Sequence, residues 1–230
     1  MRNHATSGRY GLALNMHEEC FPEKGWEVLA TLKPILLKHA AVLAGGTALA
    51  LHIGHRVSLD LDFFTASAFD LESVISAIRR TGQNFHILAE GEEHLVMDIE
   101  GVKFSLFRYE YPFLDKPARH QGVNIASILD IAAMKIIAIS QRGTKRDFVD
   151  MYFILQNIPF YKVAEHMVRR FGKERVNPVL IGKALTYFAD ADSNPEPEYI
   201  KKVKWEKIRT FFKQHAKQFT LDLRNTLDHS

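Results

Sequence analysis

Two aspartates, Asp60 and Asp62, lie two positions apart in the apolar segment VSLDLDFFT. The alternation of this segment predicts a strand, and residues two apart in a strand project from the same face. Two like charges side by side in an apolar strand are unfavourable unless a positive charge offsets them. The alternative is an exposed edge strand with two solvated charges, but the apolar flanking residues favour burial. Because Mg²⁺ binds carboxylate oxygens together with substrate phosphates, the pair predicts a Mg²⁺ site.

A glycine pair precedes the aspartates in the segment AGGTALALHIGHR. Gly45 and Gly46 close a predicted short strand, and Thr47 is expected to open a helix as its N-cap. Glycines let a ligand approach the backbone, and free N–H groups at the start of a helix favour phosphate oxygens. Alone, this motif favours an ordinary strand-to-helix turn. Because two carboxylates follow it, the combination predicts a turn that holds a triphosphate beside its metal ion.

A third group of charged residues lies in two predicted helices after residue 125. Lys135 stands in a helix that is apolar all round, where lysine is rare unless it is paired, and Arg142 shares its face. Asp147 and Asp150 share a face of the next helix, and Asp147 also fits a capping box. A buried Lys135–Asp150 ion pair and a catalytic role for both residues are equally compatible with this spacing.

The elements that must position these residues change character along the chain. Helices alternate with short strands at first, and strand pairs joined by short turns indicate a mixed sheet. After residue 125 the periodicity is helical, apart from the Pro-rich segment SNPEPEY, which predicts a linker. The expected helices are 22–38 (kinked or split at Pro34), 47–55, 69–82, 126–141, 145–157, 160–171, 177–189 and 201–219. The expected strands are 57–65, 85–90, 94–100 and 102–109, besides the short strand before Gly45.

This pattern predicts an α+β fold, in which a mixed β-sheet core with flanking helices is followed by an all-helical C-terminal lobe. The expected divisions of the chain are an N-terminal extension (1–21), the core (22–118) and the lobe (119–230).

The composition excludes several classes of protein. The 230 residues are 47% hydrophobic and 25% charged, which excludes disordered and fibrous chains. Thirty Lys and Arg against 27 Asp and Glu give a net charge of +3, which permits a nucleic-acid partner without requiring one. The single cysteine, Cys20, excludes an internal disulfide and a multi-thiolate metal site. No apolar run reaches the ~20 residues that span a bilayer, so we expect a cytoplasmic protein without a membrane partner.

The segment GGTALALHIGHRVSLDLDFFT is very similar to the signature of the AbiEii/AbiGii-type nucleotidyltransferases, within the DNA polymerase β-like superfamily. The later pattern Lys-x-x-Ala-x-x-x-Arg, followed by Arg-Asp-x-x-Asp, resembles two further motifs of this family, and the resemblance covers about residues 26–155. It implies Mg²⁺-dependent transfer of a nucleoside monophosphate from an NTP to an acceptor hydroxyl. The implied catalytic residues are Asp60, Asp62, Lys135, Asp147 and Asp150, with Asp60 and Asp62 as metal ligands. The implied nucleotide-binding residues are Gly45, Gly46, Thr47, Arg56 and Arg142.

Further metal ligands are less well defined. Enzymes of this superfamily commonly place a third carboxylate on a neighbouring strand, where this chain has Ser105. Asp98, Asp147 or Asp150 supplies the third acidic group, or the site holds one metal ion only. His52 and His55 are a possible metal pair, but no third ligand follows nearby. We therefore expect both at the surface or in a turn, with a place near the substrate open for His55.

The resemblance also implies the toxin of a toxin–antitoxin or phage-defence pair, with a cognate antitoxin protein as partner and RNA, especially tRNA, as an acceptor. Basic residues of the helical lobe are the candidates to hold RNA phosphates: Arg169, Arg170, Lys173, Arg175, Lys201, Lys202 and Lys204. Two alternatives stay open. One is transfer to a small molecule or a protein, and the other is a catalytically silent nucleotide-binding regulator.

Overall fold

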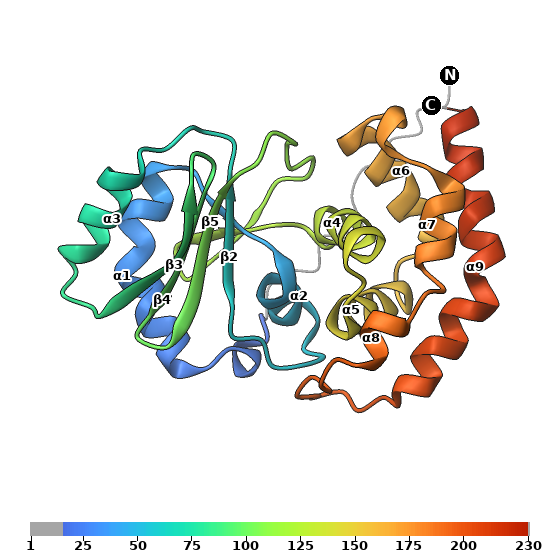
Figure 1. Cartoon of the computed structure of the whole chain (residues 1–230), viewed down its shortest axis with the longest axis horizontal. Helices are drawn as coiled ribbons and strands as arrows, with labels where there is room; N and C mark the ends of the chain where they lie inside the picture. The colour runs from blue at the N-terminus through green and yellow to red at the C-terminus, as the bar shows by residue number, and fades with distance from the viewer. Residues whose placement is uncertain (1–15, 230) are drawn as a thin grey trace, which may run out of the picture.

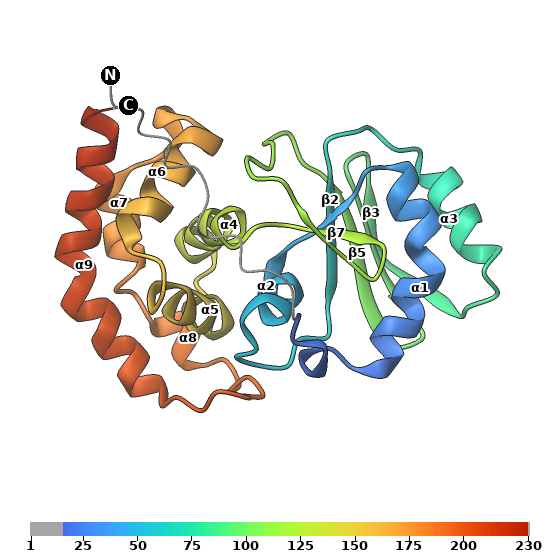
Figure 2. The same ribbon diagram turned by 180° about the vertical axis from the view of Figure 1, so that it is seen from behind.

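Residues 16–229 are described by a computed structural model, in which the elements form layers (Figure 1). Helices α1 (Glu23–Lys38) and α3 (Leu71–Arg79) cover one face of a β-sheet. Helix α2 (Gly45–Ile53) and the helices of the C-terminal half lie on the other side, as the view from behind also shows (Figure 2). None of the helices in this part of the chain is long and apolar enough to cross a membrane.

Within the described residues, the strands form one seven-stranded mixed sheet. They are β1 (Val42–Leu43), β2 (Leu61–Thr65), β3 (Phe85–Gly91), β4 (His94–Ile99), β5 (Val102–Arg108), β6 (Ala118–His120) and β7 (Val123–Ile125). Their order is β3-β4-β5-β2-β1-β7-β6. Strand β2 is parallel to β5 and antiparallel to β1, and β1 is parallel to β7.

Strand β2 lies between the hydrophobic core on one side of the sheet and the C-terminal helices on the other. Leu61 and Phe63 are fully buried, whereas Asp62 and Phe64 are partly exposed. Alternate residues of a strand point to opposite faces, so the two apolar side chains enter the core beneath the sheet. Asp62 and Phe64 consequently face the helices of the C-terminal half, where they line a cavity.

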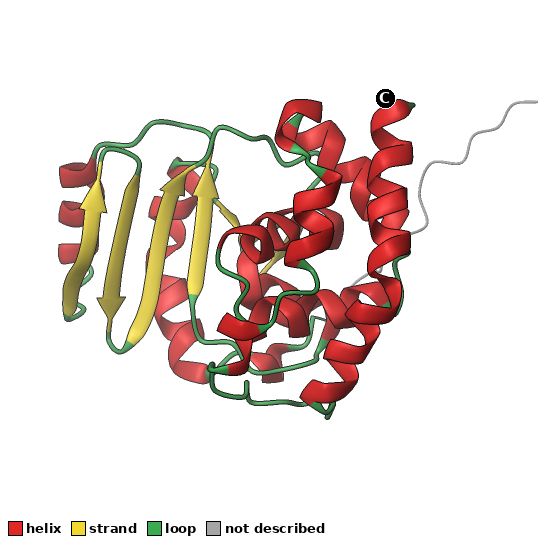
Figure 3. Ribbon diagram, turned by 45° about the vertical axis from the view of Figure 1, so that its right-hand side comes forward, coloured by secondary structure: helices red, strands yellow, loops and turns green. Residues whose placement is uncertain are grey.

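The helices after β7 lie together beside the sheet (Figure 3), and the first two of them contact helix α2. They are α4 (Ile128–Gln141), α5 (Lys145–Leu155), α6 (Phe160–Phe171), α7 (Pro178–Ala184), α8 (Ala189–Asp192) and α9 (Trp205–Asp228). Helix α4 begins after Ser127, whose hydroxyl accepts a hydrogen bond from the Asp130 N–H. Helix α5 begins with the predicted capping box of Thr144 and Asp147. The fold class predicted from the sequence is thus confirmed.

The sequence pattern does not predict strands β6 and β7. Three residues are too few to show an alternation, and β7 forms because its backbone pairs with β1. The sheet therefore extends to Ile125, beyond the end of the predicted core, although the division of the chain at residues 21 and 118 stays a prediction. Helix α1 continues through Pro34 rather than splitting there, and the residues after it, Ile35 and Leu36, are buried.

The structure also differs from the sequence prediction in the bounds of several helices and of strand β2. Helix α2 begins at Gly45 with Ala44 as its N-cap, so the prediction that Thr47 is the N-cap is wrong. Strand β2 begins at Leu61, so Asp60 lies in the loop before it. The predicted helix 177–189 is two helices, because the chain leaves the helical path at residues 185–188, and α9 extends beyond residue 219 to Asp228.

Candidate active site

A cavity of about 520 Å³ lies between the sheet and helices α4 and α5. Most of the residues predicted to form the site line it: Gly45, Gly46, Arg56, Asp60, Asp62, Lys135, Arg142 and Asp147. Thr47 and Asp150 are 1% and 0% exposed and lie behind its wall. Segments that are far apart in the sequence therefore meet at one cavity.

Asp60 and Asp62 lie at the sheet side of this cavity. Asp62 is in register with Ser105 of β5, and Asp60 Oδ2 is 3.7 Å from Nη1 of the exposed Arg146. Burial raises the pKa of Asp62, and the charge of Asp60 raises it further. Within the described part of the chain, Asp62 has no basic side chain at ion-pair distance. Two carboxylates with so little neutralising charge fit a divalent cation, which takes such oxygens together with phosphates.

The glycine pair brings the backbone against the functional side chains. Gly45 has a φ of +68°, and a Cβ at this position would lie 3.1 Å from Asp62 Oδ2. A Cβ on Gly46 would lie 2.3 Å from Nη2 of Arg56, which is too close for any side chain. Ala44, the N-cap of α2, provides no side-chain hydrogen bond to the first turn. The start of this helix therefore keeps N–H groups that can bind phosphate oxygens.

Thr47 holds the loop that carries Asp60. Its Oγ1 lies 2.9 Å from Ser58 Oγ and also contacts the backbone carbonyl of Asp60. The hydroxyl is thus engaged in fixing the loop before β2. A contact of Thr47 with a nucleotide, which stays a prediction, would have to use its backbone N–H.

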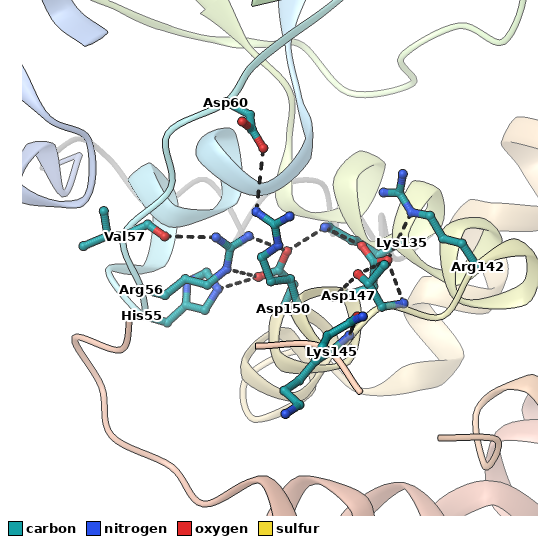
Figure 4. A network of polar contacts seen from close by, with 12 residues as sticks. His55, Arg56, Val57, Asp60, Lys135, Arg142, Lys145, Asp147 and Asp150 are labelled. Carbon is teal, nitrogen blue, oxygen red and sulfur yellow. Dashed lines mark hydrogen bonds and ion pairs between the residues drawn. The ribbon is translucent and has the colours of Figure 1, made fainter. Parts of the chain in front are cut away.

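A buried ionic network lies behind the cavity wall (Figure 4). Arg56 donates two hydrogen bonds to Asp150, from Nε to Oδ1 at 2.7 Å and from Nη2 to Oδ2 at 3.0 Å. His55 Nε2 and Lys135 Nζ contact the same carboxylate at 2.8 and 2.6 Å. Burial alone would raise the pKa of Asp150, but the charges of Arg56 and Lys135 outweigh it and hold this pKa well below its ordinary value.

The network continues to Asp147 at the start of α5. Lys135 Nζ donates to Asp147 Oδ1 at 2.9 Å, and Arg142 Nε and Thr144 Oγ1 lie 3.3 and 2.7 Å from Oδ2. Burial opposes ionisation of Asp147, but Lys135 and Arg142 lower its pKa overall. The Arg142 side chain is 66% exposed, so its guanidinium remains accessible from the cavity.

The network bears on two expectations from the sequence. The predicted Lys135–Asp150 ion pair is present, and Lys135 also lines the cavity, so a catalytic role for this lysine stays a prediction. His55 lies in the loop after α2, but the expectation that it lies at the surface is wrong, because the ring is fully buried against Asp150. Burial lowers the pKa of His55. Nothing in the local sequence indicates this contact, because the partner is 95 positions away.

Residues 194–201, which we name the strap, are not a free linker. The Val57 N–H donates to the Glu198 carbonyl at 2.9 Å, and Arg56 forms an antiparallel bridge with Tyr199. The strap thus extends the backbone pairing along the segment that carries Arg56.

Side chains fix the strap to helix α5. Glu196 accepts hydrogen bonds from Lys145 Nζ at 3.1 Å and from Tyr199 Oη at 2.8 Å. Asn194 Oδ1 accepts from the Lys145 N–H at 3.0 Å. These contacts anchor the strap beside the start of the helix that carries Asp147 and thereby keep Arg56 in place.

The candidates for a third acidic group differ in their placement. Ser105 stands opposite Asp62, as the sequence indicated. Asp98 is absent from the cavity lining, and its Oδ1 accepts from the Gly101 N–H at 2.9 Å. Asp150 is sealed behind the wall. In the described part of the chain, Asp147 is therefore the carboxylate that shares the cavity with Asp60 and Asp62.

A separate group of possible metal ligands lies elsewhere, where oxygen or nitrogen atoms of Asp115, Asp130 and His166 approach within 4.8 Å of one another. Asp130 is already paired, because Oδ1 lies 2.9 Å from His166 Nε2 and 3.2 Å from Arg170 Nη1. Because Arg170 already neutralises Asp130, the Asp60–Asp62 pair is the better site for a cation. Arg170 is only 3% exposed, so the expectation that it holds RNA is wrong.

Several residues of the cavity were not singled out from the sequence. They include Phe64, Lys103, Phe107, Tyr109 and Gln141. Strand alternation is a signal that could have found some of them, since residues 103, 105 and 107 share the face that Ser105 presents to Asp62. Arg146 is the arginine of the Arg-Asp-x-x-Asp pattern, but its proximity to Asp60 depends on how α5 approaches the loop before β2.

The comparisons with known proteins agree with this arrangement. The chain matches the family described as nucleotidyl transferase AbiEii toxin, type IV toxin–antitoxin system, over residues 27–121 and 107–228. The chain belongs to the AbiEii family. It is also 36% identical, over 182 residues, to the uncharacterized protein aq_aa25 of Aquifex aeolicus (strain VF5), which covers 77% of this chain and 86% of the relative. The resemblance inferred from the sequence is thereby confirmed, and nucleotidyl transfer by a toxin is the activity of the family.

Two solved structures share the fold of this AbiEii-family chain. MenT4, a nucleotidyltransferase toxin from Mycobacterium tuberculosis H37Rv, superimposes with a TM-score of 0.53 and 18% identity over 89% of this chain and 91% of MenT4. JHP933 from Helicobacter pylori gives a TM-score of 0.51 with 16% identity over 89% of this chain and 95% of that protein. At sequence identities this low, the similarity shows a shared fold only.

Proposed function

We propose that this AbiEii-family protein transfers a nucleoside monophosphate from an NTP to a hydroxyl of RNA, with tRNA as the leading candidate. The observation that carries the proposal is the cavity itself. It unites two poorly neutralised carboxylates, a helix start without a side-chain cap, and the cations Lys135 and Arg142. This set matches the needs of a bound triphosphate, which are a cation site, N–H donors and fixed positive charge.

Each residue of the site has a role in this proposal. The backbone of Gly45, Gly46 and Thr47 binds the β- and γ-phosphates, and Asp60 and Asp62 bind a divalent cation, which we take to be Mg²⁺. When bound there, the ion would neutralise charge that develops on the phosphates. Among the described residues Asp62 has no ion-pair partner, and its hydrogen bond with Ser105 leaves carboxylate lone pairs for a cation.

The ionic network positions the basic side chains that would contact the phosphates. Lys135 and Arg142 place positive charge against the triphosphate. Asp150 orients Lys135 and Arg56 from behind the wall, where it meets no solvent. Asp147 has a lowered pKa, which makes it a weak proton acceptor, so we assign it to positioning Lys135 and Arg142.

The reaction is an in-line displacement at the α-phosphorus. The acceptor oxygen bonds to phosphorus, the bond to the β-phosphate oxygen breaks, and pyrophosphate leaves from the glycine turn. The hydroxyl proton is released to solvent in the open cavity. A cognate antitoxin protein is the partner that we propose from the toxin family.

The proposal is tested by incubating the protein with each α-labelled NTP, Mg²⁺ and total cellular RNA, followed by separation of RNA, protein and small molecules. Label on RNA supports the proposal. Label on protein or on a small molecule supports the alternative acceptors, and NTP binding without transfer supports a silent regulator. The Asp62→Asn variant, purified in parallel, is the control for contaminating transferases.

A further inference from the structure

Three aromatic side chains line the cavity beyond the aspartates. They are Phe64 of β2, Phe107 of β5 and Tyr109, which follows β5. The rings of Phe64 and Phe107 are stacked with centroids 5.4 Å apart and an interplanar angle of 27°. Tyr109 meets Phe64 edge to face, also at 5.4 Å. We name these three residues the aromatic shelf.

Phe64 and Tyr109 of the aromatic shelf pack against core residues, but the shelf lies on the cavity side of the sheet. The core rings of the same strands, Phe63 and Phe104, point to the opposite face and are 0% exposed. The shelf residues are all partly exposed on the cavity side. Partly exposed stacked rings beside a polar site are typical of surfaces that bind flat ligands.

Strand register fixes where the aromatic shelf lies relative to the phosphates. Asp62 pairs with Ser105, and two residues further along the same strands Phe64 pairs with Phe107. Because β1 is antiparallel to β2 and pairs Val42 with Phe64, the chain reaches the glycine turn on the other side of Asp62. The order across the sheet is therefore glycine turn, aspartates, aromatic shelf.

In-line transfer gives this order a meaning. The attacking oxygen must approach the α-phosphorus from the side opposite to the leaving pyrophosphate. If pyrophosphate leaves at the glycine turn, the acceptor approaches from the aromatic shelf. Aromatic rings stack on any nucleobase, because every base has a π-face.

We infer that the aromatic shelf stacks the nucleobase of the acceptor nucleoside, so that Phe64, Phe107 and Tyr109 select an unpaired nucleotide of RNA as acceptor. This inference rests on the proposed function, because it takes pyrophosphate to leave at the glycine turn. Lys103 and Arg108 also line the cavity and can contact the neighbouring phosphates of the acceptor strand.

The inference is tested by removing either partner of the stack. Phe107→Leu removes the flat ring but keeps an apolar side chain, and Phe107→Tyr keeps the ring. The acceptor is an oligoribonucleotide with the sequence of the RNA that the wild-type protein labels, made with and without the base of the nucleoside that receives the label. Tyr187→Ala is a control, since this tyrosine is 60% exposed and distant in the sequence from the shelf. Thermal melts identify any variant that is not folded.

We expect Phe107→Leu to raise the RNA concentration for half-maximal transfer roughly tenfold, with the affinity for the NTP unchanged. Loss of the base should have a similar effect on the wild-type protein and no further effect on Phe107→Leu, because the two changes remove the same contact. Phe107→Tyr keeps the ring and should recover most of the transfer that Phe107→Leu loses, and Tyr187→Ala should behave like the wild-type protein.

Two results would overturn the inference while the proposed function stands. In one, Phe107→Leu uses RNA as well as the wild-type protein does. In the other, the losses from the two changes multiply, which shows that the ring and the base do not meet. If the wild-type protein labels no RNA, the proposed function itself fails, and the inference fails with it.

Discussion

Arg56 and Asp150 form a bidentate ion pair that is almost entirely removed from solvent, with Nε–Oδ1 and Nη2–Oδ2 distances of 2.7 and 3.0 Å. The arginine precedes β2 and packs against Gly46, and the aspartate belongs to α5. This pair therefore links the predicted phosphate-binding turn to the helical half. A change at either end should be transmitted to the cavity, although Asp150 itself does not line it.

The first prediction is that Asp150→Asn destabilises the protein strongly. The change leaves Arg56 and Lys135 buried with part of their compensating charge removed, and breaking a buried pair costs about 3–5 kcal/mol. Urea denaturation should show this loss in the free energy of unfolding. Glu165→Gln is the matched control, because its ion pair with Lys162 is solvent-exposed and such pairs contribute about 0–1 kcal/mol. Equal effects of the two changes would contradict a structural role for the network.

The same network predicts how stability depends on pH. Asp147 and Asp150 have lowered pKa values, so the stability they contribute is present at neutral pH and is lost as the pH falls toward and below about 4. His55 also makes stability fall with falling pH, but at a higher pH. Because burial lowers the pKa of His55, the unfolded chain binds the proton before the folded chain does, below about pH 6.5. The raised pKa of Asp62 acts in the opposite direction, since the folded chain binds its proton more tightly.

The measurement is the free energy of unfolding at a series of pH values from about 7 to about 4. We expect a decline with falling pH that begins near the ordinary pKa of histidine and steepens in the carboxylate range. A His55→Gln variant should lose part of the early decline, because burial also lowers the pKa of His52 and His39, and should retain the later decline. Stability that is constant over the whole range would be incompatible with the buried charges described above.

The third prediction concerns the carboxylate pair. Asp62→Asn should abolish transfer while the protein stays as stable as the wild type or becomes more stable. The pKa of Asp62 is raised by burial and by Asp60, so a neutral amide relieves an unfavourable charge when no cation is bound. Mg²⁺ should raise the melting temperature of the wild-type protein and leave that of the variant unchanged, since ligand binding to the folded state stabilises it. Transfer that survives the change would remove Asp62 from the metal site.

The sequence predicted which residues meet at the cavity better than it predicted the contacts that support them. The aspartate pair and the glycine turn were recognisable because their residues are close in the sequence, although Asp60 lies in the loop before β2 and not in the strand. The partners of Asp150 were not, because His55 and Arg56 lie 95 and 94 positions away. The strap was missed for a related reason. Its prolines exclude a helix, but its pairing with Arg56 and Val57 depends on tertiary structure.

Strand β7 and Thr47 show the same limit at the level of elements. A strand of three residues carries too little pattern to be recognised, and only the presence of β1 makes it part of the sheet. Threonine is a common N-cap residue, but the glycines before Thr47 are already helical. Its hydroxyl therefore bonds to the loop before β2 instead. Local propensity was overruled in each case by backbone pairing or packing elsewhere in the fold.

The fourth prediction tests the close packing at the glycine turn. A Cβ on Gly46 would lie 2.3 Å from Arg56 Nη2, so Gly46→Ala must displace this guanidinium from Asp150. We expect a loss of about 1–3 kcal/mol in stability together with weakened NTP binding. Gly82→Ala is the control, because its φ is +76° but no atom lies within 4 Å, so it carries backbone strain alone. Normal NTP affinity in Gly46→Ala would separate Arg56 from the nucleotide site.

The last prediction concerns the acceptor, whose more distant phosphates need cations outside the cavity. Arg175, Lys202 and Lys204 are exposed basic residues of the helical half, whereas Lys201 contacts the Ile53 carbonyl. Each RNA phosphate that a basic residue neutralises contributes about −0.7 to the slope of log affinity against log salt for a single strand and about −0.9 for a duplex. Reversing these three charges to glutamate should therefore weaken RNA labelling for all sequences and flatten its salt dependence. NTP affinity should stay unchanged, because Lys135 and Arg142 are held by the buried network and not by this surface. A salt slope identical to that of the wild-type protein would show that RNA does not contact these residues, and a parallel loss of NTP binding would show that the variant has lost its fold.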